Sequence, residues 1–207
     1  MSLARSERHA LVRTMSEVGP DAPTLCGDWT TRDLAAHLLV RERRVDTMPG
    51  IMIPPLAAHT ERVRRDATDR QWAHLLADIE SGPPKWSPLY LLDSVANAAE
   101  MFVHHEDVRR GTPGWEPRAL PADVQDQLWR LARMIARAGY KGTDITVIFE
   151  RPGGEQATVR KRGPRIVVLR GEPSELLLHA FGRDEVRVEA SGDAADVAEL
   201  TASQRGL

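Results

Sequence analysis

Residues 97–111, NAAEMFVHHEDVRRG, place a glutamate and a histidine four residues apart in a segment that otherwise reads as a helix. At that spacing, Glu100 and His104 project from the same face of the helix. With about 100° per residue, a narrow polar stripe forms between apolar borders, and its members are Asp93, Asn97, Glu100, His104 and Asp107. Short acids, an amide and a histidine bind metals or accept protons. We therefore interpret the stripe as facing a site, with an exposed polar stripe as the alternative.

A second histidine belongs to the segment 25–44, which is predicted to form an amphipathic helix after a turn at its start. His37 falls on the apolar side of that helix, where an imidazole without a partner would cost about 1–3 kcal/mol. Considered alone it is a core histidine with a hydrogen-bond partner; considered beside Glu100 and His104, it completes a site. Two histidines and one glutamate match the ligand set of a catalytic divalent metal, usually zinc, with one position open to water or substrate.

Composition limits the other possibilities. The formal net charge of −2 over 207 residues gives no electrostatic reason to expect a nucleic-acid partner. The sequence contains no run of about 18 apolar residues that would span a bilayer, and its N-terminal residues lack the apolar core of a secretory signal. A single cysteine excludes an internal disulfide and suits a reducing compartment. We expect a cytoplasmic protein with no membrane partner, as a monomer or a homodimer.

Other catalytic chemistry has weaker support in the sequence. There is no G-x-S-x-G motif, P-loop, glycine-rich dinucleotide fingerprint or H-E-x-x-H motif. Cys26 is a possible nucleophile or ligand, but its neighbours in sequence include no cation that would lower its pKa. We interpret Cys26 as a structural residue.

Periodicity and turn residues predict helices first and then a mixed unit, with a boundary near residue 115. Within 25–44, Gly27 and Asp28 form a turn and Thr30 or Thr31 caps the helix that follows. The other predicted helices cover 2–17, 56–65, 68–80, 88–110, 122–138, 176–181 and 193–202. The predicted strands cover 144–150, 155–161, 165–170 and 185–190. The segment 48–59 is predicted to be a loop at the wall or lid of a pocket. The expected architecture is α+β, with domains at 1–115 and 116–207.

Two runs, LCGDWTTRDLAAHL (25–38) and NAAEMFVHHEDVRR (97–110), resemble the mycothiol-dependent maleylpyruvate isomerase family of actinobacteria, a branch of the DinB/YfiT-like metalloproteins. The runs GEPSELLLHAFGR (171–183) and VEASGDAADVAEL (188–200) are similar to the C-terminal domain of that family. The resemblance covers nearly the whole chain. It implies an N-terminal DinB-like four-helix bundle followed by a small α+β domain of the sterol-carrier type.

The resemblance also implies roles for particular residues. The zinc ligands of the family correspond to His37, Glu100 and His104, the set already reached from the polar stripe and the apolar helix. The Gly182–Arg183 pair resembles a position that holds the thiol cofactor in that family. The side chains expected to orient the ligands from behind are His105, Asn97 and Asp107.

The implied function is a zinc-dependent enzyme that uses the low-molecular-weight thiol mycothiol as its nucleophile. Metal coordination deprotonates a thiol whose solution pKa is about 8.5, and the thiolate is the attacking form. Reversible addition to an activated alkene would give a cis–trans isomerase, and permanent transfer to a small electrophile would give a thiol S-transferase. The alternatives are a non-catalytic metal- or ligand-binding DinB-like protein and an interaction module with a solvated stripe.

Overall fold

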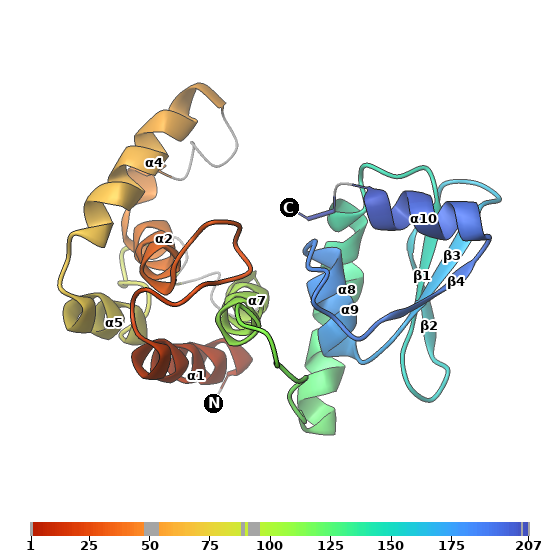
Figure 1. Ribbon diagram of the computed structural model, residues 1–207, viewed down its shortest axis with the longest axis horizontal. Coiled ribbons are helices and arrows are strands. Elements are labelled where there is room, and N and C mark those ends of the chain that lie inside the picture. The colour runs from red at the N-terminus through yellow and green to blue at the C-terminus, as the bar shows by residue number, and fades with distance from the viewer. Residues whose placement is uncertain (1, 48–53, 88–89, 91–95, 204, 207) are drawn as a thin grey trace. The chain divides into compact units, whose positions relative to one another are not determined.

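The computed structural model describes residues 2–47, 54–87, 90, 96–203 and 205–206. The chain divides into two compact units, Met1–Trp115 and Glu116–Leu207. The first is helical, and the second combines helices with a four-stranded sheet (Figure 1). This mixture confirms the predicted α+β class. Among the described residues, no helix has both the length and the apolar character needed to cross a bilayer.

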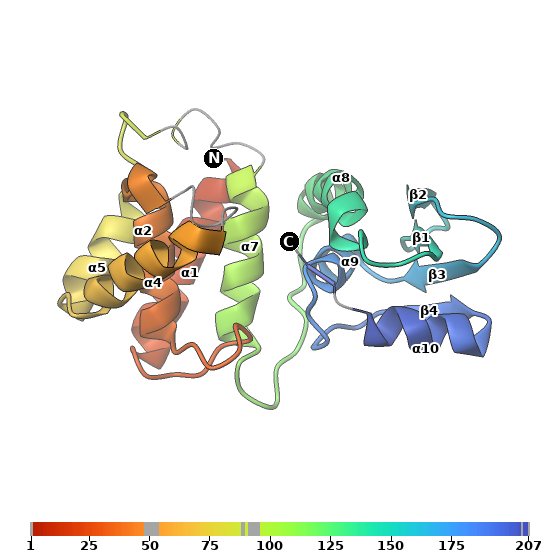
Figure 2. The same cartoon turned by 90° about the horizontal axis from the view of Figure 1, so that it is seen from above.

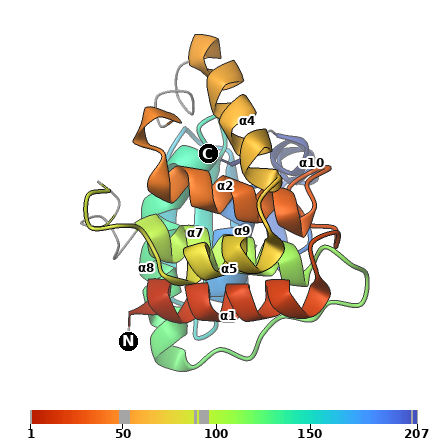
Figure 3. The same ribbon diagram turned by 90° about the vertical axis from the view of Figure 1, so that its left-hand side faces the viewer.

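In the described part of the N-terminal unit, four helices are roughly aligned and a fifth lies at an angle to them (Figure 3). The aligned helices are α1 (Leu3–Val18), α2 (Thr31–Arg43), α5 (Trp72–Glu80) and α7 (Ala96–Arg109). The angled helix is α4 (Pro54–Thr68), which follows the short 3₁₀ turn η1 (Val45–Thr47). All five helices contribute to one hydrophobic core, in which Leu11, Leu34, Leu75 and Met101 are fully buried.

The N-terminal unit differs from the sequence prediction around residue 54. The segment 48–59 was predicted to be a loop, but Pro54 begins helix α4, so the prediction is wrong from that residue onward. Proline fits the first turn of a helix, because its missing N–H has no partner there. Residues 48–53 lie outside the described residues, as does Asp93 of the polar stripe.

The C-terminal unit packs two helices on one face of a mixed sheet (Figure 2). Helices α8 (Ala122–Gly139) and α9 (Pro173–Ala180) pack against each other, and α10 (Ala194–Ala202) packs beside β3 and β4. The strands are β1 (Thr146–Glu150), β2 (Gln156–Arg160), β3 (Ile166–Arg170) and β4 (Glu189–Gly192), in the spatial order β2-β1-β3-β4. The β1–β3 pair is parallel and the two outer pairs are antiparallel.

More buried and less buried side chains alternate along the central strands, and this alternation determines which face of the sheet is buried. Val147 and Phe149 of β1 are fully buried and pair in register with Val167 and Leu169 of β3, as expected for a strand that covers one face. Helices α8 and α9 approach each other closely at Gly139, where an added Cβ would lie 2.2 Å from the Ala180 carbonyl oxygen. Glycine at this position therefore allows the two helices to cover the sheet together.

The last strand is displaced from its predicted position. The sequence predicted a strand over 185–190, whereas β4 covers Glu189–Gly192. Before β4, the backbone N–H of Arg187 donates a hydrogen bond of 2.8 Å to the Glu175 carboxylate of α9. That N–H is thereby committed to a helix side chain, and strand pairing with β3 begins two residues later at Glu189.

Candidate metal centre

The start of α2 fixes the position of His37. Thr30 caps the helix in a reciprocal arrangement: its side chain accepts from the Asp33 N–H, and the Asp33 carboxylate accepts from the Thr30 N–H at 3.1 Å. Arg64 of α4 forms an ion pair with Asp33 at 2.7 Å and lies over the Trp29 ring. The Trp29 ring is in turn 5.3 Å from the ring of His37. His37 therefore projects from an anchored helix with an aromatic wall beside it.

Helices α2 and α7 bring His37, Glu100 and His104 together, with donor atoms within 4.8 Å of one another. Glu100 Oε1 lies 3.5 Å from His37 Nε2 and 3.2 Å from His104 Nε2. The side chains of His37 and Glu100 keep 28% and 21% of their exposure, so the group is only partly buried. The sequence predicted this set, with Glu100 and His104 joined by helical spacing and His37 contributed by a different helix.

The spacing of these atoms suits ligands of one metal ion. Charge-assisted hydrogen bonds between nitrogen and carboxylate are about 2.7–2.9 Å long, and both distances to Glu100 are longer. Zinc ligands lie about 2.0–2.2 Å from the metal, so two of them in a tetrahedral arrangement are about 3.3–3.6 Å apart. The distances of 3.5 Å and 3.2 Å are close to that range. The residues present therefore fit a divalent metal in both donor type and separation.

The pKa shifts within this group reflect the carboxylates on both sides of His104, which favour a positive charge between them. Burial lowers the pKa of His37, which leaves its ring neutral. Burial also opposes the charged forms of Glu100 and His104, but their hydrogen bonds outweigh it. Hydrogen bonds with His104 and His37 hold the pKa of Glu100 well below its ordinary value. Those with Asp107, Cys26 and Glu100 raise the pKa of His104 well above its own. A divalent metal would take the place of the proton on His104 Nε2, which faces Glu100, while the proton on Nδ1 stays with Asp107.

Asp107 orients the His104 ring. The fully buried Asp107 carboxylate accepts a hydrogen bond of 2.8 Å from His104 Nδ1, which leaves Nε2 directed toward Glu100. A carboxylate behind a metal-binding histidine fixes the tautomer and makes the imidazole more basic. Asp107 therefore lies where the sequence predicted a supporting side chain.

Cys26 belongs to the same group of residues, although the sequence interpretation made it structural. Its thiol donates to Asp107 Oδ2 at 3.1 Å and lies 3.8 Å from His104 Nδ1. Cys26, His104 and Asp107 thus form a second possible metal-binding set that shares His104 with the first. The two sets use opposite nitrogens of one ring. This contact could not be predicted from the residues around Cys26, because its partners lie about 80 residues further along the chain.

Arg41 and Asn97 support the glutamate from the other side. Arg41 Nε lies 3.4 Å from Glu100 Oε1, and Arg41 Nη1 donates to the Asn97 side-chain oxygen at 2.8 Å. Asn97 is fully buried, so it holds the guanidinium against Glu100. Asn97 thus acts on the candidate ligands through Arg41.

His105 lies on a different side of α7 from His104. Its Nδ1 is 2.9 Å from Glu7 Oε2, and its Nε2 is 3.0 Å from Thr14 Oγ1, and both partners belong to α1. Consecutive residues on a helix point about 100° apart, so His105 joins α7 to α1 while His104 faces α2. The predicted support of the ligands by His105 has no counterpart in these two contacts.

Gly182 and Arg183 lie in the C-terminal unit, directly after α9. Gly182 has φ +84°, and a Cβ there would lie 2.7 Å from the Arg205 carbonyl oxygen, so glycine is required on both grounds. Arg183 Nη1 donates to the Phe181 carbonyl oxygen at 2.8 Å, so the side chain folds back on the end of the helix. Its role in thiol binding remains a prediction.

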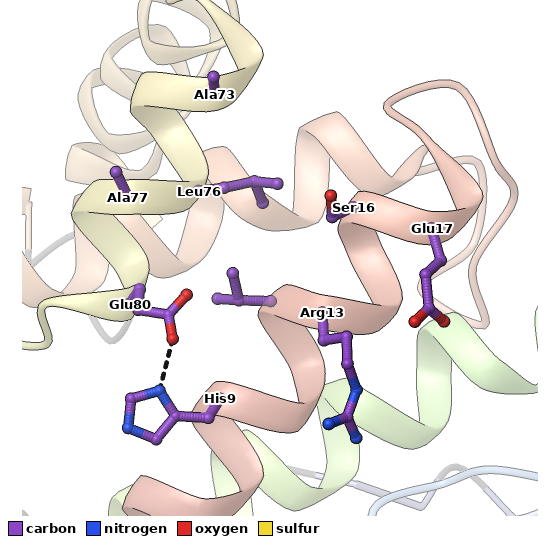
Figure 4. A pocket seen from close by; sticks show the side chains of 9 residues that line it. His9, Arg13, Ser16, Glu17, Ala73, Leu76, Ala77 and Glu80 are labelled. Atoms are coloured by element: carbon purple, nitrogen blue, oxygen red, sulfur yellow. Dashed lines mark hydrogen bonds and ion pairs between the residues drawn. The ribbon is translucent and has the colours of Figure 1, made fainter.

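A groove elsewhere in the N-terminal unit lacks comparable chemistry. A groove of about 820 Å³ lies between α1 and α5, where His9 and Glu80 form an ion pair at 2.5 Å (Figure 4). Within the described parts of the chain, groups of three side chains able to share a metal occur only around His104. The size of a cavity therefore does not identify the candidate site here.

Comparison with known proteins supports the fold. No protein-family model and no curated protein matches the chain. Two solved structures match it: the crystal structure of the mycothiol-dependent maleylpyruvate isomerase and that of a histidine-to-alanine mutant of the enzyme. Each is 15% identical, covers 91% of this chain and 90% of its own, and superposes with a TM-score of 0.54. The resemblance noted in the sequence is thus confirmed at the level of structure, and the chain shares the fold of the mycothiol-dependent maleylpyruvate isomerase.

Proposed function

We propose that this protein is a divalent-metal-dependent enzyme, with zinc as the metal, that uses mycothiol as the nucleophile in an isomerase or thiol S-transferase reaction on a small electrophile. The observation that carries the proposal is the convergence of His37, Glu100 and His104 from two helices. The fold shared with a mycothiol-dependent isomerase supports the choice of thiol.

The side chains of this site have separable roles in the proposal. His37, Glu100 and His104 would hold the metal, which would supply a Lewis acid that stabilises a thiolate at neutral pH. Asp107 keeps the proton on His104 Nδ1, so that Nε2 is the coordinating atom. Arg41 holds Glu100 in place. The Trp29 ring, 5.3 Å from the His37 ring, would shield one side of the site from water.

Thiol binding is the property that tests the proposal. Calorimetry on zinc-loaded protein should detect mycothiol binding that disappears in His37→Ala. The matched control is His9→Ala, which removes an exposed histidine of the same unit and should bind mycothiol like the wild type. Absence of binding at millimolar thiol to a zinc-loaded wild-type protein would favour a non-catalytic metal-binding protein instead.

Product analysis then separates the two reactions. Incubation with mycothiol and maleylpyruvate, followed by NMR, would give the trans isomer with the thiol regenerated if the protein is an isomerase. A stable thioether conjugate would identify an S-transferase. If neither product forms although mycothiol binds, maleylpyruvate is the wrong electrophile, and the proposal continues only for other activated substrates.

A further inference from the structure

A second cluster of charged side chains lies in the C-terminal unit. A groove of about 760 Å³ runs between the C-terminal half of α8 and the end of β2. Among the described residues that line it, none is acidic and five are cationic: Arg133, Arg137, Arg160, Lys161 and Arg162. The chain as a whole has a net charge of −2. The fold has therefore gathered positive charge that is dispersed in the sequence.

The positive charge of this groove is not neutralised by carboxylates, unlike that of other arginines in the same unit. Arg151 pairs with Asp126, Arg165 with Glu199 and Arg170 with Glu150, at 2.5, 2.6 and 2.7 Å. Among the residues that the structure describes, none of the five groove cations has a carboxylate within ion-pair distance. The paired arginines are thus ordinary surface ion pairs, whereas the five groove cations face the same open space without a carboxylate partner among the described residues.

Two elements present these cations to the groove from different sides. Arg133 and Arg137 are one helical turn apart and so project from the same face of α8. On the other side, Arg160 Nη2 donates to the Lys141 carbonyl oxygen at 3.0 Å, which fixes its guanidinium. Planar guanidinium groups bind phosphate oxygens through paired hydrogen bonds. The groove thus resembles a clamp for an anion with several oxygens.

Protection of a sheet edge explains only part of this arrangement. β2 is the outer strand next to β1, and cations on an outer strand oppose pairing with another sheet. That argument covers Arg160 and Lys161, which lie at the end of the strand. It does not cover Arg133 and Arg137, which belong to a helix.

We propose that this groove binds a small molecule bearing two or more phosphate groups. Its volume lies within the range of small-molecule sites, about 300–1,000 Å³, and its charge exceeds what one anionic group would neutralise. A long nucleic acid fits less well, because an extended polyanion would also meet the negative charge of the rest of the chain. This inference is independent of the proposed metal and thiol chemistry.

The test is calorimetric titration of the full chain with inorganic tripolyphosphate at low ionic strength. The variant Arg133→Gln/Arg137→Gln should bind at least about tenfold more weakly, as expected for lost charged hydrogen-bonding partners. The matched control, Arg165→Gln/Arg170→Gln, removes the same charge from paired positions and should bind like the wild type. Thermal melting of both double variants should remain near that of the wild type, because all four positions are exposed.

Several outcomes would overturn the inference. Equal weakening in both double variants would mean diffuse attraction by net charge. Sulfate binding as tightly as tripolyphosphate would mean a site for a single anion. A single-stranded oligonucleotide whose affinity exceeds that of tripolyphosphate and rises with length would identify a nucleic-acid surface. If the wild-type protein does not bind tripolyphosphate, the groove is not a site for molecules with several phosphate groups.

Discussion

His104 in the N-terminal unit and His179 in the C-terminal unit are both largely buried histidines with contacts at both ring nitrogens, but their neighbours have opposite charge. His104 lies between the carboxylates of Asp107 and Glu100. His179 lies between the Tyr140 hydroxyl and the Arg205 guanidinium. The first environment raises the pKa of its histidine, whereas burial and then Arg205 lower the pKa of the second to about 3.

This difference separates a candidate site from a structural network. Arg205 only donates hydrogen bonds, so His179 Nε2 accepts, and Nδ1 carries the proton donated to Tyr140. Every polar atom of the His179 ring is then used within the fold, and the adjacent cation repels further positive charge. The His104 group instead attracts a cation and remains partly open. Burial of a histidine alone therefore does not indicate function; the charge around it does.

The largest contrast is expected in metal affinity. His104→Ala removes a ligand, so zinc affinity should fall well beyond the roughly 10- to 100-fold loss that removal of an outer partner causes. The helical circular dichroism should persist, because metal loss leaves the apolar core intact. His179→Gln is the control and should keep wild-type zinc affinity. Competition with a chromophoric chelator measures both, and equal affinities in the two variants would remove the distinction.

Acid should destabilise the C-terminal unit through His179. The folded pKa of about 3 lies below the ordinary value of 6.5, so the unfolded chain takes up a proton in this interval and the folded chain does not. Stability should therefore fall as the pH is lowered from about 6.5 toward 3, by up to about 1.4 kcal/mol per pH unit. Hydrogen exchange of β1 peptides measures this loss. The slope should be shallower in His179→Gln, and an unchanged slope would contradict the assignment.

The support that Asp107 gives to His104 is expected to matter next. Asp107→Asn preserves shape but leaves a weaker acceptor for His104 Nδ1–H, so zinc affinity should fall about 10- to 100-fold. Asp126→Asn, an exposed acid of the other unit, serves as the control. A zinc affinity equal to that of the wild type would mean that Asp107 has only a packing role.

A further prediction concerns whether the C-terminal unit has a role in thiol chemistry. If Arg183 binds the thiol, Arg183→Lys should weaken mycothiol binding by about 1–3 kcal/mol, since lysine lacks the planar fork of donors. Zinc content and melting temperature should stay unchanged, and Arg187→Lys supplies the control. Unaltered mycothiol affinity in Arg183→Lys would restrict the search for thiol contacts to other cations, with Arg41 first.

The smallest effect is expected at Cys26. A thiol is a weak donor, so Cys26→Ser should change zinc affinity by less than about threefold if Cys26 only supports Asp107. Titration of zinc into the two proteins measures this directly. A loss as large as that of His104→Ala would mean that zinc prefers the set formed by Cys26, His104 and Asp107.

Much of the fold was predictable because its signals are local. Helical periodicity and turn residues predicted α1, α2, α8 and the first three strands close to their observed limits. The predictions failed where the decisive contacts are distant. Pro54 was predicted to lie in a loop because proline interrupts helices, but the structure places it at the start of α4. The Arg187 N–H is withdrawn from the sheet by Glu175, which lies 12 residues earlier in the chain.

The candidate site shows the same limit. Helical spacing and a polar residue on an apolar face were enough to propose His37, Glu100 and His104. Cys26 could not be linked to Asp107 by spacing, because the contact depends on how the loop before α2 packs on α7. The direction of His105 likewise depends on α1 packing beside α7. The three candidate ligands were therefore predictable from their own helices, whereas the contacts of Cys26 and His105 with other elements were not.

X-ray absorption spectroscopy of the zinc-loaded protein tests the central claim most directly. If His37, Glu100 and His104 hold the metal, the spectrum should contain imidazole and oxygen scatterers at about 2.0–2.2 Å and no sulfur. Addition of mycothiol should then introduce one sulfur at about 2.3 Å, equally in wild type and in Cys26→Ser. A sulfur scatterer that is present before thiol is added and absent in Cys26→Ser would contradict the account, as would a protein that retains no metal at neutral pH.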